Sequence, residues 1–269
     1  MKVGQLVGLT TAAARNLLFG GNLAALTMVR HPRQMMNYVV WAVFLQKIMS
    51  NRRGLPQKNV FEVLPSTGDV EQVQFGSLES GLSWFWTIPS DWVDIVSLSL
   101  ICRLIKPKVV FEIGTLHGYS AFQFALNTPD ESRIYTLDLP RDGSVAPSMR
   151  RSVVDEEHTR THAGVTRYCF ESHPVARKIT CLQGDSATFD YSPYHGNVDL
   201  FFIDGAHSYD YVRSDTLNAL ACCRPQGVIA WHDFGRSGMN GVSRWLCELS
   251  KTHKVYSVPG GSLAYMVKP

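Results

Sequence analysis

Short apolar runs alternate with helical stretches along the second half of the chain. Seven runs predict strands, at 109–113, 133–137, 179–182, 199–203, 228–231, 255–258 and 264–267. Consecutive Val, Ile and Phe in several runs are typical of strands covered on both faces. Helical stretches at 92–105, 120–126, 209–223 and 242–250 separate them. This alternation predicts an α/β fold with a Rossmann-like, doubly wound and mostly parallel sheet. Its last two strands, around Gly260-Gly261, are expected to form an antiparallel pair.

The first 60 residues follow a different pattern. Two helices are predicted there, over 11–19 and 34–49, with Gly20-Gly21 and His31-Pro32 as breaks between them. We therefore predict an N-terminal helical arm over 1–60 and a second unit over 61–269. Within that unit, 141–178 is rich in Arg, His and Ser and has little periodicity, which predicts an inserted lid or loop.

Charge separates the same two parts. No acid occurs before Glu62, so the arm carries +8 and leaves −5 of the net +3 for the remainder. A nucleic-acid substrate is not expected, because the larger part lacks the basic footprint that such binding needs. The apolar run 38–45 is too short to span a bilayer. For the arm, the open alternatives are a cover over the active site, a contact in a homo-oligomer, a membrane-surface helix and an organelle-targeting leader.

Cysteine spacing favours a cytoplasmic protein with reduced thiols. The chain of 269 residues has six cysteines, no Cys-x-x-Cys, and no Cys/His spacing that matches a zinc site. Free cysteines of this kind are usually small buried apolar residues.

The first candidate site follows the first predicted strand. Gly114 and Gly118 have Gly-x-x-x-Gly spacing, and Glu112 precedes the first glycine by two residues. A dinucleotide fingerprint needs G-x-G-x-x-G instead, and a carboxylate at 112 would repel a pyrophosphate. The stretch favours a ligand that carries an ammonium group.

Two further acids follow later strands. Asp138 lies at the end of the second strand, roughly 20 residues after the glycine turn, where doubly wound folds place the acid that binds ribose hydroxyls. Asp185 follows the third strand. Ligands of open parallel sheets bind at the carboxyl ends of the strands, so both acids are candidate ligand contacts.

The next two strand ends carry metal-binding chemistry. Asp204 ends one strand, and His232 and Asp233 end the next. Neighbouring strands lie about 5 Å apart, so these side chains are expected to converge. Two carboxylates suit a hard divalent cation such as Mg²⁺, with His232 as a further ligand or an orienting group.

These stretches resemble the class I S-adenosylmethionine-dependent methyltransferases. The glycine turn is similar to their motif I. Ile-Asp-Gly-Ala-His-Ser-Tyr at 203–209 and Trp-His-Asp-Phe at 231–234 look like a bacterial group of these enzymes. That group includes metal-dependent O-methyltransferases acting on sugars and natural products, akin to the catechol O-methyltransferase type. The resemblance covers about 75–267.

The resemblance implies roles for the strand-end residues. Glu112 would contact the amino-acid end of S-adenosylmethionine through its local network, Asp138 the ribose, and Asp185 the region of the adenine amino group. The full cofactor-binding set that it implies is Glu112, Gly114, Gly118, Ser120, Asp138, Asp185 and Asp204. The implied metal ligands are Asp204, His232 and Asp233.

Two departures from the catechol type bear on the chemistry. His207 stands where that type has a catalytic Lys, and His232-Asp233 stand in place of Asp-Asn. A His has an ordinary pKa near 6.5, against about 10.4 for Lys, so His207 is the expected general base. A His among the ligands softens the site and leaves the metal open.

The expected function is methyl transfer from S-adenosylmethionine to a hydroxyl of a small molecule or sugar, assisted by a divalent metal. A nicotinamide-dependent oxidoreductase is one alternative, which Asp138 alone would allow. A non-catalytic protein of the same fold, held at a membrane by its basic arm, is another.

Overall fold

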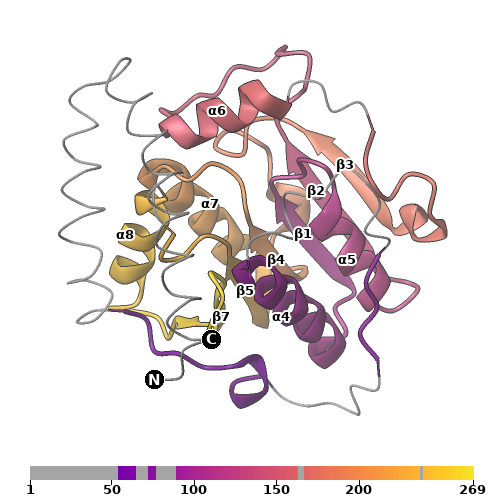
Figure 1. The fold of residues 1–269 in the computed structure, drawn as a ribbon, viewed down its shortest axis with the longest axis vertical. Helices are drawn as coiled ribbons and strands as arrows, with labels where there is room; N and C mark the ends of the chain where they lie inside the picture. The colour runs from indigo at the N-terminus through magenta and orange to yellow at the C-terminus, as the bar shows by residue number, and fades with distance from the viewer. Residues whose placement is uncertain (1–53, 65–71, 77–88, 163–166, 237–238) are drawn as a thin grey trace, which may run out of the picture.

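The computed structural model describes residues 54–64, 72–76, 89–162, 167–236 and 239–269 (Figure 1). The predicted helices of the arm lie outside these residues. The helices described are α4 (Pro89–Ile105), α5 (Tyr119–Asn127), α6 (Val153–His162), α7 (Tyr209–Cys222) and α8 (Asn240–Leu249). The strands are β1 (Val109–Ile113), β2 (Arg133–Asp138), β3 (Ile179–Gln183), β4 (Val198–Ile203), β5 (Cys223–Trp231), β6 (Tyr256–Ser257) and β7 (Ala264–Val267). Short 3₁₀ turns lie at Val60–Glu62, Pro174–Lys178 and Ser192–Tyr194.

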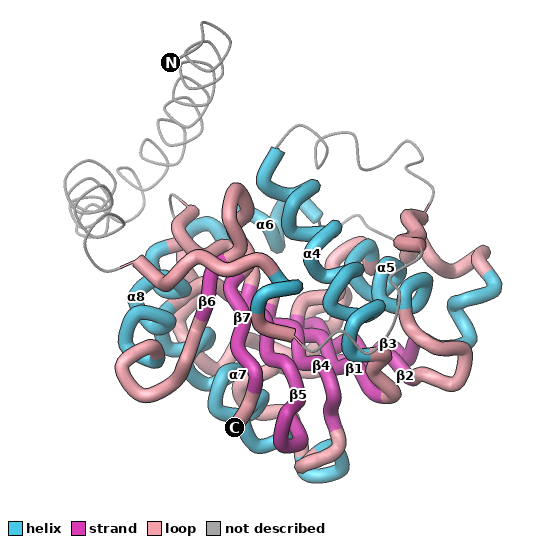
Figure 2. The backbone as a smooth tube through the Cα atoms, turned by 90° about the horizontal axis from the view of Figure 1, so that it is seen from below, coloured by secondary structure: helices cyan, strands magenta, loops and turns pink. Residues whose placement is uncertain are grey.

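The strands form one sheet in the order β3-β2-β1-β4-β5-β7-β6. β1 to β5 pair in parallel, and β7 runs antiparallel to both β5 and β6. Figure 2 shows the sheet running through the molecule with helices on either side. The predicted α/β fold and its antiparallel ending are therefore confirmed.

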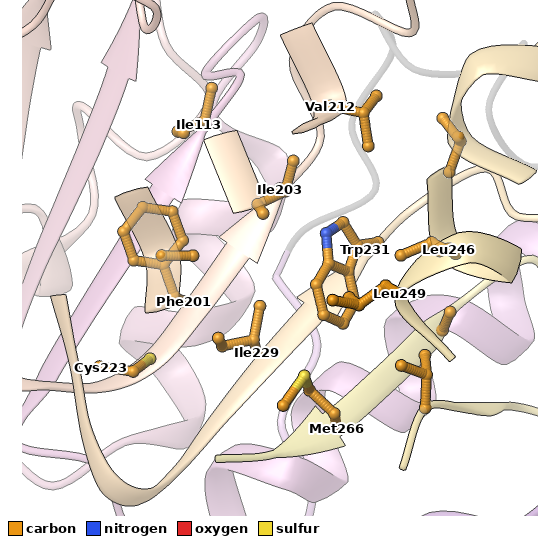
Figure 3. Close-up of a cluster of buried hydrophobic side chains, with 14 of the residues drawn as sticks. Ile113, Phe201, Ile203, Val212, Cys223, Ile229, Trp231, Leu246, Leu249 and Met266 are labelled. Carbon is orange, nitrogen blue, oxygen red and sulfur yellow. The ribbon is translucent and has the colours of Figure 1, made fainter. Parts of the chain in front are cut away.

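Successive side chains of the central strands point to opposite faces of the sheet and enter two separate hydrophobic cores. On one face, Phe201, Ile203 and Trp231 pack with residues of α7 and α8. Figure 3 shows the Trp231 indole near Leu246 of α8 and Val212 of α7. On the other face, Leu200 and Phe202 pack with α4 and α5. Burial on both faces explains the continuous apolar runs, because neither side of a central strand meets water.

The insert contains a helix that the sequence pattern did not predict. α6 has only two apolar residues in its first turn, and Val154 enters the core. Its start is stabilised by a reciprocal pair: Asp155 Oδ2 accepts the Ser152 amide at 2.7 Å, and the Asp155 amide donates to Ser152 Oγ at 3.2 Å. Such a capping arrangement sets a helix start without apolar periodicity.

Other differences concern element ends. α4 begins at Pro89 rather than at 92, and β5 begins at Cys223 rather than at 228. The six cysteines are all free thiols. Among the described residues, no helix combines the length and the apolar character that crossing a bilayer requires.

Candidate functional site

The turn after β1 is packed directly against the end of β4. Gly114 has a φ of +100°, and a Cβ there would lie 2.1 Å from the Asp204 carbonyl oxygen. Gly118 has a φ of +77° at the start of α5, and a Cβ would lie 2.4 Å from the Phe170 ring. Both positions therefore need glycine, and the backbone follows a path that a side chain would block.

Glu112 is completely buried beneath this turn. Its carboxyl group accepts hydrogen bonds from the Ser120 hydroxyl and, at 2.6 Å, from the Thr136 hydroxyl. Burial raises the pKa of Glu112 to about 8, because the charged form is poorly solvated there. Ser120, expected to line the cofactor, is thus tied to the acid that precedes the turn.

Asp138 lies at the end of β2 and faces the same turn. Its Oδ2 accepts the Leu116 amide at 2.9 Å, and its Oδ1 accepts the Leu139 amide at 2.8 Å. Burial raises its pKa, although these amide bonds oppose the shift. Glu112, Gly114, Gly118, Ser120 and Asp138 are therefore held together at one corner of the sheet.

Asp185 is buried after β3 and binds the insert. Its Oδ2 accepts the Ser148 amide at 2.6 Å. Its Oδ1 accepts the Tyr211 hydroxyl at 3.0 Å and the Ala187 amide at 3.2 Å. The acid expected near adenine thus also fixes the beginning of the insert.

The ends of β4 and β5 bring the three expected metal ligands together. His232 Nδ1 lies 3.1 Å from Asp204 Oδ1 and 3.4 Å from Asp233 Oδ1. One donor atom from each residue lies within 4.8 Å of the others. Asp233 is turned toward the group by a left-handed backbone, with a φ of +62°. Two carboxylate oxygens and an imidazole nitrogen at this separation fit a divalent cation.

His207 is buried and held between two acids. Its Nδ1 lies 2.5 Å from Asp155 Oδ1, and its Nε2 lies 2.8 Å from Asp233 Oδ2. The Asp155 Oδ1 also accepts the His207 backbone amide at 3.1 Å. Burial alone would lower the pKa of His207, but the two carboxylates outweigh it and raise the pKa well above 6.5. Both ring nitrogens are therefore engaged in this arrangement.

Four polar residues of this edge were missed by the sequence analysis as site residues. Asp155 comes from α6, Asp91 and Asp94 from α4, and Arg236 follows β5. Arg236 pairs with Asp91 and lies 2.9 Å from Asp233 Oδ1, while Asp94 Oδ2 lies 3.2 Å from His232 Nε2. The available signal was weak: acids at 91 and 94 at the start of an otherwise apolar helix, and an acid run in an insert without periodicity.

A small pocket opens between these strand ends and the helices beside them. It is lined by residues 203–207, Val212, Trp231, His232 and Val242. His207 and His232 both line this pocket. The carboxyl ends of the parallel strands therefore carry two kinds of chemistry. The glycine turn and its acids suit an ammonium-bearing nucleoside, and Asp204, His232 and Asp233 beside them suit a cation.

Known proteins match the same part of the chain. Residues 111–234 match a family described as a methyltransferase domain. Caffeoyl-CoA O-methyltransferase 3 of Nicotiana tabacum is 26% identical over 112 residues, which is 40% of this chain and 38% of that protein. Caffeoyl-CoA O-methyltransferase of Stellaria longipes is 38% identical over 45 residues, 17% of this chain and 19% of that one. The matched regions thus cover less than half of these curated relatives.

Solved structures with a similar arrangement include the O-methyltransferase TomG from Streptomyces achromogenes, described in complex with SAM. It is 21% identical, with a TM-score of 0.46 over 66% of this chain and 80% of that chain. An O-methyltransferase from Bacillus cereus is 17% identical, with a TM-score of 0.43 over 65% of this chain and 81% of that chain. The family match at residues 111–234 includes the strand-end motifs from Glu112 to Asp233, so it agrees with the methyltransferase resemblance of those motifs.

Proposed function

We propose that this protein transfers a methyl group from S-adenosylmethionine to a hydroxyl of a small molecule or sugar, with a divalent cation at the site. One observation carries the proposal. Glu112, the glycine turn and Asp138 lie at the carboxyl ends of β1 and β2, and β4 and β5 bring Asp204, His232 and Asp233 together at the same edge. A methyl donor and an acceptor hydroxyl need just this proximity.

The residues around the turn fit the donor. Gly114 and Gly118 let the turn pack closely against the end of β4 and against Phe170, and both adopt a left-handed backbone that glycine accepts easily. Glu112 is buried beneath the turn, so we propose that it acts on the amino-acid end of the donor through its bond to Ser120. We propose that Asp138, which two backbone amides hold in place, contacts the ribose, and that Asp185 lies near the adenine. When bound, S-adenosylmethionine supplies a methyl group already activated on a sulfonium.

Asp204, His232 and Asp233 are the proposed cation ligands, and Asp204 also borders the cofactor turn through its carbonyl. A divalent cation there supplies Lewis acidity, which lowers the pKa of an acceptor hydroxyl. Mg²⁺ suits the two carboxylates, and Mn²⁺ tolerates the imidazole as well. Arg236, beside Asp233, keeps that carboxylate in place.

We propose His207 as the proton acceptor, with Asp155 as its orienting partner. Asp155 holds Nδ1 at 2.5 Å, so the nitrogen that exchanges protons is Nε2. Because Nε2 lies 2.8 Å from Asp233 and the two carboxylates raise the pKa of His207, this contact must open and the Nε2 proton must leave before a substrate proton can be taken. Asp155 then stabilises the imidazolium that forms.

Calorimetric titration of the full chain tests the donor. S-adenosylhomocysteine is expected to bind, and NAD⁺ is expected to bind at least tenfold more weakly or not at all. The reverse order of affinities would favour an oxidoreductase and end the proposal. An acceptor screen with isotope-labelled S-adenosylmethionine, over catechols and sugars with Mg²⁺ or Mn²⁺, then defines the product.

With an acceptor in hand, His207→Ala separates the two halves of the proposal. Turnover is expected to fall by about 100-fold or more, as for loss of a general base, while affinity for S-adenosylhomocysteine changes less than threefold. Asp190→Ala is the matched control, because Asp190 is exposed after β3 and its carboxylate accepts the Ser192 amide within its own loop. A His207→Ala protein that loses donor affinity but keeps turnover per bound complex would rule out the base role.

A further inference from the structure

Asp94 is a buried carboxylate whose two oxygens both accept hydrogen bonds from the loop between β6 and β7. It lies in the second turn of α4 and is 1% exposed. Oδ1 accepts the backbone amides of Ser262 at 2.8 Å and Leu263 at 2.9 Å. Oδ2 accepts the Ser262 hydroxyl at 2.6 Å and lies 3.2 Å from His232 Nε2. The orientation of the carboxylate is therefore set by the loop between β6 and β7.

The backbone of that loop lies in close contact with the Asp94 carboxylate. A Cβ at Gly261 would lie 2.2 Å from Asp94 Oδ1, so only glycine lets the loop approach so closely. With Oδ1 occupied by two amides, Oδ2 is the oxygen that remains to face the imidazole. The contact between α4 and His232 is thus built by three segments: α4, the end of β5 and the β6–β7 loop.

The other nitrogen of His232 faces the opposite way. Nδ1 lies 3.1 Å from Asp204 Oδ1 and 3.4 Å from Asp233 Oδ1, the oxygens proposed to hold a cation. The side chain of His232 is only 11% exposed, and acids lie at both of its nitrogens, so its ring has little freedom to turn. A carboxylate behind a histidine is the usual means of fixing which nitrogen carries the proton and which offers its lone pair to a metal.

We propose that Asp94 is a positioning residue that keeps the proton of His232 on Nε2 and so directs the Nδ1 lone pair at the cation held by Asp204 and Asp233. This inference rests on the proposed function, because it assumes a divalent cation at that site.

Asp91, Asp94 and His232 also come close enough together to suggest a second cation site. The contacts argue against it. Asp91 is paired with the Arg236 guanidinium, and both oxygens of Asp94 already accept hydrogen bonds. The positive charge of this group is supplied by Arg236, so Asp94 acts on the metal site through His232 rather than as a ligand of its own ion.

Asp94→Asn tests the inference with little change in shape. The two backbone amides of the β6–β7 loop keep the amide oxygen at the place of Oδ1, so the new NH₂ group replaces Oδ2 and faces His232 Nε2. His232 Nε2 must then accept, and its proton moves to Nδ1. Affinity for Mn²⁺, measured by calorimetry on the full chain, is expected to fall about 10- to 100-fold. Affinity for S-adenosylhomocysteine without metal is expected to stay within threefold.

Two variants separate the tautomer from other effects. Asp91→Asn removes the same charge from the same helix but has Arg236 as its partner, and we expect Mn²⁺ affinity to change less than threefold. Ser262→Ala removes one bond to Oδ2 yet leaves a carboxylate facing His232, and we also expect it to bind Mn²⁺ nearly normally. If Asp94→Asn does not fold, ¹⁵N-histidine NMR of the wild-type chain, with His232→Gln for assignment, still reports which ring nitrogen is protonated.

The outcomes are distinct. Equal losses of Mn²⁺ affinity in Asp94→Asn and Asp91→Asn, or a wild-type His232 protonated on Nδ1 alone, overturn the positioning role. A wild-type chain that binds S-adenosylhomocysteine but no divalent cation overturns it together with the metal part of the proposed function, and leaves the methyl donor in place. A chain that binds Mn²⁺ but not S-adenosylhomocysteine would exclude S-adenosylmethionine as the methyl donor. The role of Asp94 would then still be decided by the Mn²⁺ affinities of Asp94→Asn and its controls.

Discussion

The two halves of the functional edge are built in different ways. At the ends of β1 and β2, Glu112 and Asp138 are satisfied by neutral donors: two hydroxyls for the first and two backbone amides for the second. We call this the donor half. At the ends of β4 and β5, acids and cations from separate segments pair with one another, and we call this the charged half. Its described members are Asp91, Asp94, Asp155, Asp204, His207, His232, Asp233 and Arg236.

This difference predicts different responses to mutation. Loss of an acid in the donor half leaves neutral groups that water or a neighbour can satisfy, so its main cost falls on ligand binding. Loss of an acid in the charged half leaves a buried cation without its partner, which costs several kcal/mol of stability. A donor-half variant that mainly loses stability, or a charged-half variant that mainly loses ligand binding, would contradict this comparison.

The largest effect is expected where the two halves meet. Gly114→Ala would place a Cβ 2.1 Å from the Asp204 carbonyl, at a φ of +100°. We expect a loss of about 4 kcal/mol in the free energy of unfolding, because neither backbone can move without disturbing β1 or β4. Gly143→Ala is the control, since its φ is +72° but nothing lies within 4 Å of the added Cβ. It should cost only about 1 kcal/mol, and equal losses in urea unfolding would show that the two halves do not depend on this close contact.

Asp233→Asn is expected to have the next largest effect. It deprives His207 and Arg236 of a buried carboxylate at 2.8 and 2.9 Å. About 3 kcal/mol of stability should be lost, as for other broken buried pairs. Asp138→Asn, in the donor half, should cost less than about 1 kcal/mol because one amide bond survives. Urea unfolding without ligands measures both, and similar losses would contradict the distinction between the halves.

Acid substitutions in the two halves should weaken the binding of different ligands, each by about 2 kcal/mol. Asp138→Ala is expected to weaken S-adenosylhomocysteine about 10- to 100-fold, since it removes a charged acceptor of hydrogen bonds. Its affinity for Mn²⁺ should not change. Asp204→Asn is expected to weaken Mn²⁺ binding and to leave the affinity for S-adenosylhomocysteine unchanged when the latter is measured without metal. Calorimetry of each variant with each ligand gives four values, and a variant that weakens both ligands equally would show that the halves act as one site.

The smallest effect concerns the titration of Glu112. Its pKa is raised from 4.5 to about 8 by burial, so between these values the folded protein keeps a proton that the unfolded chain has lost. Stability therefore falls as pH rises through this range, by about 1.4 kcal/mol per pH unit. Glu112→Gln cannot titrate at this position. The free energy of unfolding of this variant, relative to the original protein, should therefore increase by about 1.4 kcal/mol from pH 6 to pH 7. Unfolding at both pH values measures it, and a constant difference would mean that Glu112 is ionised in the folded protein.

The acids at the strand ends of both halves followed from local pattern. Apolar runs marked the strands, and a residue that directly follows a run in a parallel sheet lies at its carboxyl edge. The positions of Glu112, Asp138, Asp204 and Asp233 could therefore be predicted without knowing how the helices pack. Gly114 could be predicted for the same reason, because a tight turn after a buried strand needs a φ that glycine adopts easily.

By itself, the sequence determined the order of strands and helices and the chemistry placed at each strand end, because both depend on neighbours along the chain. Only the tertiary structure decided which groups stand behind His207 and His232. Asp155 and Asp94 reach them from α6 and α4, 52 and 138 residues away along the chain. The pattern around either acid carries no record of that distant partner, since such a contact is set by the packing of a helix on the sheet. The protonation and orientation of the two imidazoles therefore depend on the whole fold.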